Sequence, residues 1–161
     1  MIINNKKYRS IWMSEDKLSI EIIDQRYLPF EFIIETINSS TEMAVAIRDM
    51  HLRGAPLIGV AAAYGMYLAA LEASRKPDFS QHLKFSEILL LNTRPTAVNL
   101  KWAINRVRKE IDKARTIEEI ISNVYKIAEK IADEDVENCK SIGKYGVEII
   151  ENISLKKKGE T

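Results

Sequence analysis

The arrangement of this 161-residue chain is decided by the stretch RGAPLIGVAAAYG, residues 53–65. Proline suits the first position of a helix, because its φ angle is already helical and its missing N–H has no partner there. We therefore expect a tight turn at Gly54 and Ala55, followed by an apolar helix that runs to about Ser74. The free N–H groups of its first turn would lie beside Arg53, and a helix N-terminus next to an arginine favours a bound anion.

A second arginine–proline pair occurs in NTRPTAVNL, residues 92–100. Arg94 precedes Pro95, and a helical pattern of apolar residues follows to about Ala114. Two helix starts of this kind predict the two sides of a phosphate site built around Arg53 and Arg94. The alternative is that both starts are only structural, since most surface arginines are solvated or form weak ion pairs.

The composition, with 46% hydrophobic and 29% charged residues, is that of a soluble globular protein. The net charge of +1 gives no electrostatic footprint for nucleic acid or for an anionic membrane. The single cysteine, Cys139, excludes an internal disulfide framework, and the two histidines lack the spacing of metal ligands. We therefore predict no metal, no cofactor, no nucleic-acid partner and a location in the reducing cytoplasm.

Two segments bear on the membrane question. Residues 1–8 lack the apolar core of a signal peptide. Residues 54–71 form the least charged run, but its length is marginal for a membrane span and its Gly, Ala and Tyr content is only weakly lipophilic. We expect a buried helix of a soluble protein here and no membrane partner.

Strand patterns are confined to residues 1–38. Tyr8–Met13 and Leu18–Asp24 predict a β-hairpin around the polar turn 14–17, because apolar and polar residues alternate in the second segment. Glu31–Ile37 is a third segment rich in β-branched residues. Together they predict a small antiparallel sheet.

Helical patterns fill residues 39–155, so the fold class we predict is α+β, a small sheet followed by a helical bundle in one N-terminal domain. Capping boxes at Ser39–Glu42 and Thr116–Glu119 are expected to open two of the helices. Gly143 and Gly146 are expected to weaken or bend the last helix, because glycine is a poor helix former.

Several helical residues have both a structural and a functional interpretation. A glycine inside a helix costs up to about 1 kcal/mol against alanine, so Gly59 and Gly65 predict close packing rather than ligand contact. Trp102 is expected in the core rather than stacked on a cofactor. The acidic residues 133–135 suggest paired acid–base carboxylates, but a solvated helical face is favoured. Cys139 is expected to be an inert thiol.

Three motifs carry a family resemblance. RGAPLIGVAAAYG, RPTAVNL at residues 94–100 and DQRYLP at residues 24–29 resemble the N-terminal signature of the methylthioribose-1-phosphate isomerase family. The resemblance runs in order across almost the whole chain. Leu57 is one departure, because the family usually has alanine there.

The resemblance implies an aldose–ketose isomerase that converts methylthioribose 1-phosphate to methylthioribulose 1-phosphate, a step of methionine salvage and so of amino-acid biosynthesis. Such chemistry needs an acid–base group and firm anchoring of the phosphate dianion. The resemblance assigns substrate binding to Arg53, the backbone of Gly54 and Ala55, and Arg94. It assigns no catalytic residue, metal or cofactor to this chain.

Members of the family continue into a second, doubly wound α/β domain that carries a catalytic cysteine followed by an aspartate. The resemblance implies that this domain is missing here and that residues 156–161 are a truncated linker to it, in a fragment, a split chain or a truncated product. We expect the chain alone to be inactive. The partners implied are a sugar-phosphate substrate and a C-terminal domain or second chain, in a cytoplasmic homodimer.

Two other functions stay open. Regulatory subunits of the eukaryotic guanine-nucleotide exchange factor of translation initiation resemble this fold and bind partner proteins, but they generally lack the full RGAPxIGVAAAYG run. Ribose-1,5-bisphosphate isomerase would keep sugar-phosphate chemistry with another substrate. A second phosphate should require further basic groups, whereas a thioether should require an apolar pocket.

Overall fold

A three-stranded antiparallel sheet forms the N-terminal part of the chain, as the alternating pattern predicted. The structure is a computed structural model that describes residues 2–3 and 5–157. The strands follow the order β3-β4-β5, with bounds β3 Ile11–Met13, β4 Ile20–Ile23 and β5 Ile34–Ile37. In the central strand Ile22 lies opposite Ile11 and is fully buried, so the sheet contributes one face to the core.

A short strand pair precedes the sheet and was not predicted. Its two strands are β1 Ile2–Ile3 and β2 Lys6–Lys7, paired antiparallel with Ile3 opposite Lys6. Two residues a strand are too few to show the period-2 pattern on which a sequence prediction depends.

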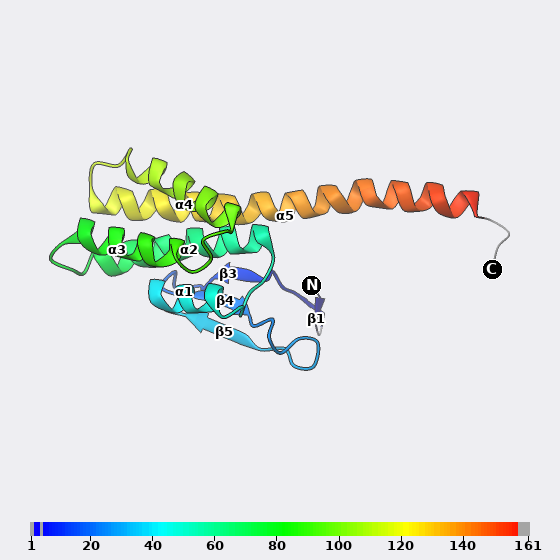
Figure 1. The fold of residues 1–161 in the computed structure, drawn as a ribbon, viewed down its shortest axis with the longest axis horizontal. Coiled ribbons are helices and arrows are strands. Elements are labelled where there is room, and N and C mark those ends of the chain that lie inside the picture. Colours follow the sequence, from blue (N-terminus) through cyan, green and yellow to red (C-terminus); the bar gives the residue numbers. More distant parts are fainter. Residues whose placement is uncertain (1, 4, 158–161) are drawn as a thin grey trace.

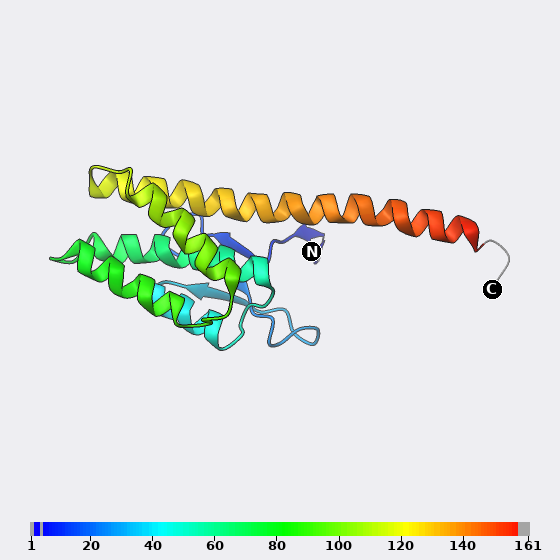
Figure 2. The same ribbon diagram turned by 45° about the horizontal axis from the view of Figure 1, so that its top comes forward.

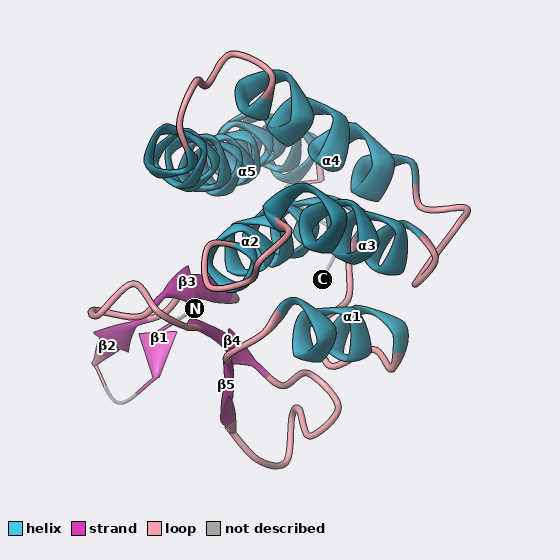
Figure 3. Cartoon of the chain, turned by 90° about the vertical axis from the view of Figure 1, so that its left-hand side faces the viewer, coloured by secondary structure: helices cyan, strands magenta, loops and turns pink. Residues whose placement is uncertain are grey.

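Five helices follow the sheet. Their bounds are α1 Ser40–Arg48, α2 Ala55–Ala73, α3 Phe79–Leu91, α4 Val98–Ile111 and α5 Ile117–Lys156. Figure 3 shows α2 in the centre, with the other helices and the sheet around it. Among the described residues α2 is the one helix long and apolar enough to cross a membrane. Since 72% of that apolar window is buried within the fold, its hydropathy is that of a core helix.

The two predicted capping boxes are confirmed. The Ser39 hydroxyl accepts a hydrogen bond from the Glu42 backbone N–H at 3.0 Å, and the Thr116 hydroxyl accepts one from the Glu119 N–H at 3.2 Å. In return, each glutamate carboxylate accepts the backbone N–H of the residue before the N-cap, Asn38 or Arg115. These contacts satisfy donors that have no intrahelical partner, which fixes where α1 and α5 begin.

The helix predicted from Pro95 begins three residues later, at Val98. The Ala97 N–H donates to the Arg94 carbonyl at 2.9 Å, which closes a turn over residues 94–97. A proline after an arginine therefore starts a turn here rather than a helix. Proline fits the first central position of a β-turn as well as it fits a first helical turn, because both need the same φ.

The placement of Trp102 in the core was wrong. Its side chain is 46% exposed, and Val98, on the same side of α4, is 79% exposed. The buried face of α4 consists of apolar side chains at helical spacing, Leu100, Ala103, Ile104 and Val107. Trp102 instead carries the Arg106 guanidinium 4.8 Å above its ring centre, a cation–π contact that stabilises a partly solvated tryptophan.

Helix α5 is unbroken to Lys156, so Gly143 and Gly146 do not divide it. Apart from neighbouring residues and the helix's own backbone, no described atom lies within 4 Å of the position that a Cβ would take at either glycine. Figures 1 and 2 show why: the first half of α5 packs along the bundle, and its second half projects beyond the other helices. The fold class is α+β, as predicted.

Candidate functional site: an open helix start beside Arg53

The first turn of α2 is open to solvent and has no side-chain cap. Gly54 occupies the N-cap position with φ of 111°, a backbone conformation that favours glycine. Its carbonyl accepts the first intrahelical bond, from the Ile58 N–H at 2.9 Å. The N–H groups of the first turn therefore face outward without a side-chain acceptor, the arrangement that binds anions at helix N-termini.

Arg53 directly precedes the N-cap residue Gly54. Its side chain is exposed, and one of its guanidinium N–H groups donates to the Gln25 backbone carbonyl at 2.6 Å. No carboxylate in the described part of the chain pairs with it, whereas Arg9, Arg26 and three other arginines each pair with an aspartate or a glutamate. The positive charge of Arg53 is thus available to an anion.

A hollow of about 770 Å³ adjoins this helix start. We call it the cationic hollow, because Lys7, Arg9, Arg53 and Lys140 are among its lining residues, together with Gly54. Arg9 is partly neutralised by Asp133 at 2.8 Å, and Lys140 is partly neutralised by Glu137 at 2.6 Å. The remaining cations and the dipole of α2 act on the same space, so their effects on an anion add.

Residues far apart in sequence complete the cationic hollow, and sequence reasoning did not place them beside this helix start: Gln25, Asp135 and Cys139 all line it. Asp135 is half-buried, and burial raises its pKa. Asp133 is exposed, as predicted for a solvated acidic face, whereas Asp135 is less exposed than predicted. Cys139 is an exposed free thiol, and its inertness stays a prediction.

Arg94 lies at the same end of the bundle but outside the lining of the cationic hollow. Figures 1 and 2 show α2 and α4 beginning near each other, and a Cβ added to Gly59 would lie 3.0 Å from the Asn99 carbonyl oxygen. The close packing predicted for Gly59 is confirmed. Arg94 sits on the turn that precedes α4, half-buried, and its side chain makes no hydrogen bond or ion pair within residues 2–3 and 5–157. The structure brings together Arg53 and Gly54, and it leaves Arg94 on a neighbouring turn.

A second hollow, of about 920 Å³, lies against the same start of α2. We call it the apolar hollow: Val98, Trp102, Ile142, Tyr145 and Ile149 are among its lining residues. Both hollows share residues of α2 and α5, namely Pro56, Val60, Asp135 and Cys139. The helix start is therefore flanked by a charged surface and an apolar one.

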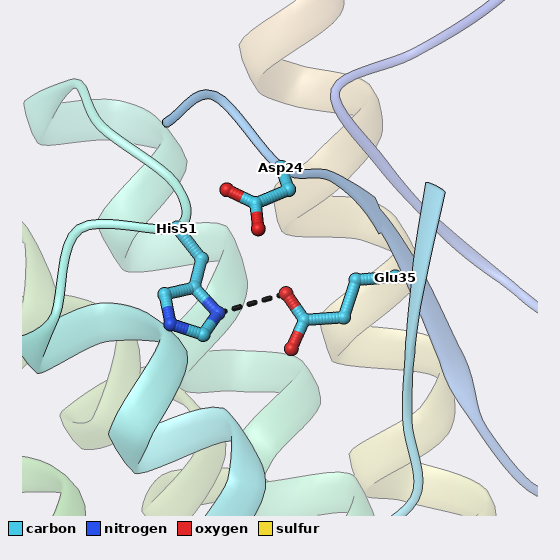
Figure 4. A group of neighbouring side chains, drawn as sticks. All are labelled: Asp24, Glu35 and His51. Atoms are coloured by element: carbon cyan, nitrogen blue, oxygen red, sulfur yellow. Dashed lines mark hydrogen bonds and ion pairs between the residues drawn. The ribbon is translucent and has the colours of Figure 1, made fainter. Parts of the chain in front are cut away.

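Behind the cationic hollow, Asp24, Glu35 and His51 bring three ligand-type atoms within 4.8 Å of one another (Figure 4). The Asp24 carboxylate is gripped at both oxygens by the Arg26 guanidinium, at 2.9 and 2.5 Å, which lowers the Asp24 pKa. His51 Nδ1 lies 2.7 Å from Glu35 Oε2. A metal ion would have to displace Arg26, so the residues form an ion-pair network rather than an open metal site. The absence of a metal stays a prediction.

Comparison with known proteins places these motifs in a family. The model of the initiation factor 2 subunit family matches residues 51–159, which contain both arginine–proline motifs. The chain belongs to the initiation factor 2 subunit family.

Curated members of this family resemble the chain along its whole length. It is 43% identical over 158 residues to the methylthioribose-1-phosphate isomerase of Sinorhizobium medicae (strain WSM419), covering 98% of this chain and 42% of that protein. It is 41% identical over 162 residues to the methylthioribose-1-phosphate isomerase of Desulfatibacillum aliphaticivorans, covering 100% and 44%. The chain thus spans about two fifths of the length of these relatives. They confirm the resemblance carried by the three motifs.

Solved structures of two family branches share the fold. The 5-methylthioribose 1-phosphate isomerase from Pyrococcus horikoshii OT3 matches with a TM-score of 0.81 at 40% identity, covering 89% of this chain and 41% of that one. The delta subunit of translation initiation factor eIF-2B from A. fulgidus matches with a TM-score of 0.79 at 37% identity, covering 89% and 42%. Similarity alone therefore leaves both an isomerase and an initiation-factor subunit as candidates.

Proposed function

We propose that this chain is the substrate-binding part of an aldose–ketose isomerase that acts on methylthioribose 1-phosphate in methionine salvage. The observation that carries the proposal is the uncapped start of α2, which opens beside Arg53 into the cationic hollow. Isomerisation moves hydrogen between two neighbouring carbons, and a firmly held phosphate keeps those carbons in place during the transfer.

In this proposal the phosphate lies at the N-terminus of α2. The backbone of Gly54 and Ala55 and the guanidinium of Arg53 provide its donors, and Arg94 approaches from the turn before α4. A guanidinium is suited to the role, because its planar fork can donate to two phosphate oxygens at once. Neither arginine has a carboxylate partner among the described residues, so neither must break an ion pair to bind.

The chain itself supplies no catalytic residue in this proposal. The two catalytic groups come from a C-terminal domain or a second chain, in a cytoplasmic homodimer. Support comes from the coverage of the relatives, about two fifths of their length, and from the apolar face of α5, which we define as Ile142, Tyr145, Ile149, Ile150 and Ile153. All five side chains are more than half exposed. A contiguous exposed apolar surface of this kind is typical of a docking site, and we propose the C-terminal domain as its occupant.

The anion site is tested by titrating inorganic phosphate and methylthioribose 1-phosphate into variants of the chain. Arg53→Ala and Arg94→Ala should each remove a hydrogen bond to a charged group, about 1.5–3 kcal/mol, or roughly one to two decades in affinity. Arg75→Ala is the matched control, since Arg75 is an exposed arginine just past the other end of α2. Unchanged affinity in both site variants would show that the two motifs are only structural.

An assay of turnover tests whether this chain contains the catalytic group. Purified 1–161 should not turn over methylthioribose 1-phosphate, with or without Cys139→Ser. Robust turnover by the chain alone that disappears in Cys139→Ser would place the catalytic group in this chain and overturn the proposal.

The second candidate is a non-catalytic regulatory subunit, favoured by the likeness to the A. fulgidus delta subunit. In that case the chain would bind partner proteins, and phosphate would not bind at the start of α2. The phosphate titration above therefore separates the two functions.

A further inference from the structure

The loop between α1 and α2 holds Arg53 through the backbone of Gln25. The Gln25 N–H donates to the His51 carbonyl at 2.7 Å, and the Gln25 carbonyl accepts from the Arg53 guanidinium at 2.6 Å. Both the N–H and the carbonyl of Gln25 thus form hydrogen bonds with the loop between α1 and α2. The position of the Arg53 charge therefore depends on how firmly the loop is fixed against the end of β4.

The His51 side chain provides that fixation from the interior. It is buried, and its Nδ1 lies 2.7 Å from the Glu35 carboxylate on β5, the strand paired with β4. Its backbone N–H donates to the Ala46 carbonyl of α1 at 2.9 Å. Figure 4 shows the imidazole directed toward Glu35, with Asp24 beside it. His51 consequently links α1, the sheet and the loop that carries Arg53.

The charges around this contact keep it in one arrangement. Asp24 is occupied by Arg26, so its carboxylate is not free to replace Glu35 as the partner of His51. Asp49, on the same loop, pairs with Arg48 at 2.9 Å. Glu35 is therefore the carboxylate that bonds the ring, and a partly buried hydrogen bond with a single available partner favours one geometry.

We propose that His51, held by Glu35, is a positioning residue that fixes Arg53 for anion binding. The proposal rests on the proposed anion site at the start of α2. It assigns no contact with substrate to His51: the imidazole acts through the loop and through the Gln25 peptide.

The test is a double-mutant cycle on phosphate affinity. The affinity is measured in the isotope-labelled chain from the NMR shift of the Gly54 amide as inorganic phosphate is added. Glu35→Ala should weaken phosphate binding about three- to tenfold, the effect of losing one coupled neighbour. Glu35→Gln should stay close to the unmodified chain, because an amide oxygen can still accept from the ring. In the Arg53→Ala background Glu35→Ala should change nothing further.

Glu87→Ala is the matched control, because Glu87 pairs with Arg108 near the end of α4 and should not affect phosphate. Melting temperatures of all variants separate stability from affinity; if Glu35→Ala does not fold, His51→Ala replaces it in the cycle. The positioning role is refuted if Glu35→Ala leaves affinity unchanged, or weakens it equally with and without Arg53. If Arg53→Ala itself does not change phosphate affinity, the proposed anion site is refuted. That outcome is distinct from refutation of the positioning role alone.

Discussion

Replacing Gly59 by alanine should destabilise the protein at the contact that sets α4 against α2. An added Cβ would lie 3.0 Å from the Asn99 carbonyl oxygen and 3.5 Å from the Asn99 carbonyl carbon. These are main-chain atoms in the first turn of α4, so they cannot rotate away and the helix itself must move. Overpacking of this kind costs about 1–3 kcal/mol. The gain in helix propensity is about 1 kcal/mol, which leaves a net loss of about 1 kcal/mol.

Urea unfolding of three alanine variants measures this difference. At Gly65 the Cβ would meet Leu90 and Met43 side-chain atoms at 2.9–3.1 Å, which can shift, so Gly65→Ala should lose less than Gly59→Ala. At Gly143 no such contact lies within 4 Å, so Gly143→Ala should not lower the midpoint and should raise helicity. A Gly59→Ala midpoint equal to or above that of the unmodified chain would refute the packing argument.

Three further outcomes are expected. Tyr64→Phe removes the 2.7 Å hydrogen bond from the Tyr64 hydroxyl to Glu129 and should lower the free energy of unfolding by about 1 kcal/mol, measured by thermal unfolding. Burial raises the pKa of Asp135, so the folded state disfavours its charged form; Asp135→Asn should raise the melting temperature at pH 7, and the gain should vanish near pH 3, where both states hold the proton. The isolated chain should self-associate through the apolar face of α5 in light scattering. Ile149→Lys should abolish this, but Leu155→Lys should not: each side chain is 61% exposed, and the two point about 120° apart around the helix.

Local signals made much of the fold predictable. The strands β3 to β5 follow from alternation and from β-branched residues, and α2 ends at Ala73, one residue before the predicted Ser74. Ser39 and Thr116 mark their helix starts because a capping hydroxyl and the N–H that it accepts lie only three residues apart. Each of these features is decided by neighbours in sequence, so a sequence pattern can report it.

The errors came where one local signal serves two structures. Pro95 fits a turn as well as a helix start, and the hydrogen bond from Ala97 to Arg94 selects the turn. Trp102 was expected in the core from its residue type, but the stripe that contains Val107 is the one that faces α2. Which stripe of a helix is buried depends on its neighbours, and the sequence of α4 alone does not state it.

The same distinction applies to the candidate site. Arg53 and Gly54 could be found because they adjoin the proline that marks the helix. Gln25 lies 28 residues before Arg53, and Asp135 belongs to the last helix. Their arrival in one hollow is a result of tertiary packing. A periodic signal was available for Asp135 and Cys139, since both continue the stripe of α5 whose earlier member Ala132 is buried.

That stripe connects the proposed anion site to the exposed half of α5. A helix keeps one face along one direction, and the face of α5 that packs on α2 continues past the end of the bundle. Its successive members, three or four residues apart, are Ala128, Ala132, Asp135, Cys139, Ile142, Gly146 and Ile149. Asp135 and Cys139 line both hollows, and Ile142 and Ile149 are exposed. A domain that covers the apolar face of α5 from Ile142 onward would therefore lie beside the start of α2, because Ile142 and Pro56 line the same hollow. Because excluding water strengthens a charged contact, the affinity of Arg53 for a phosphate should rise when that face is covered.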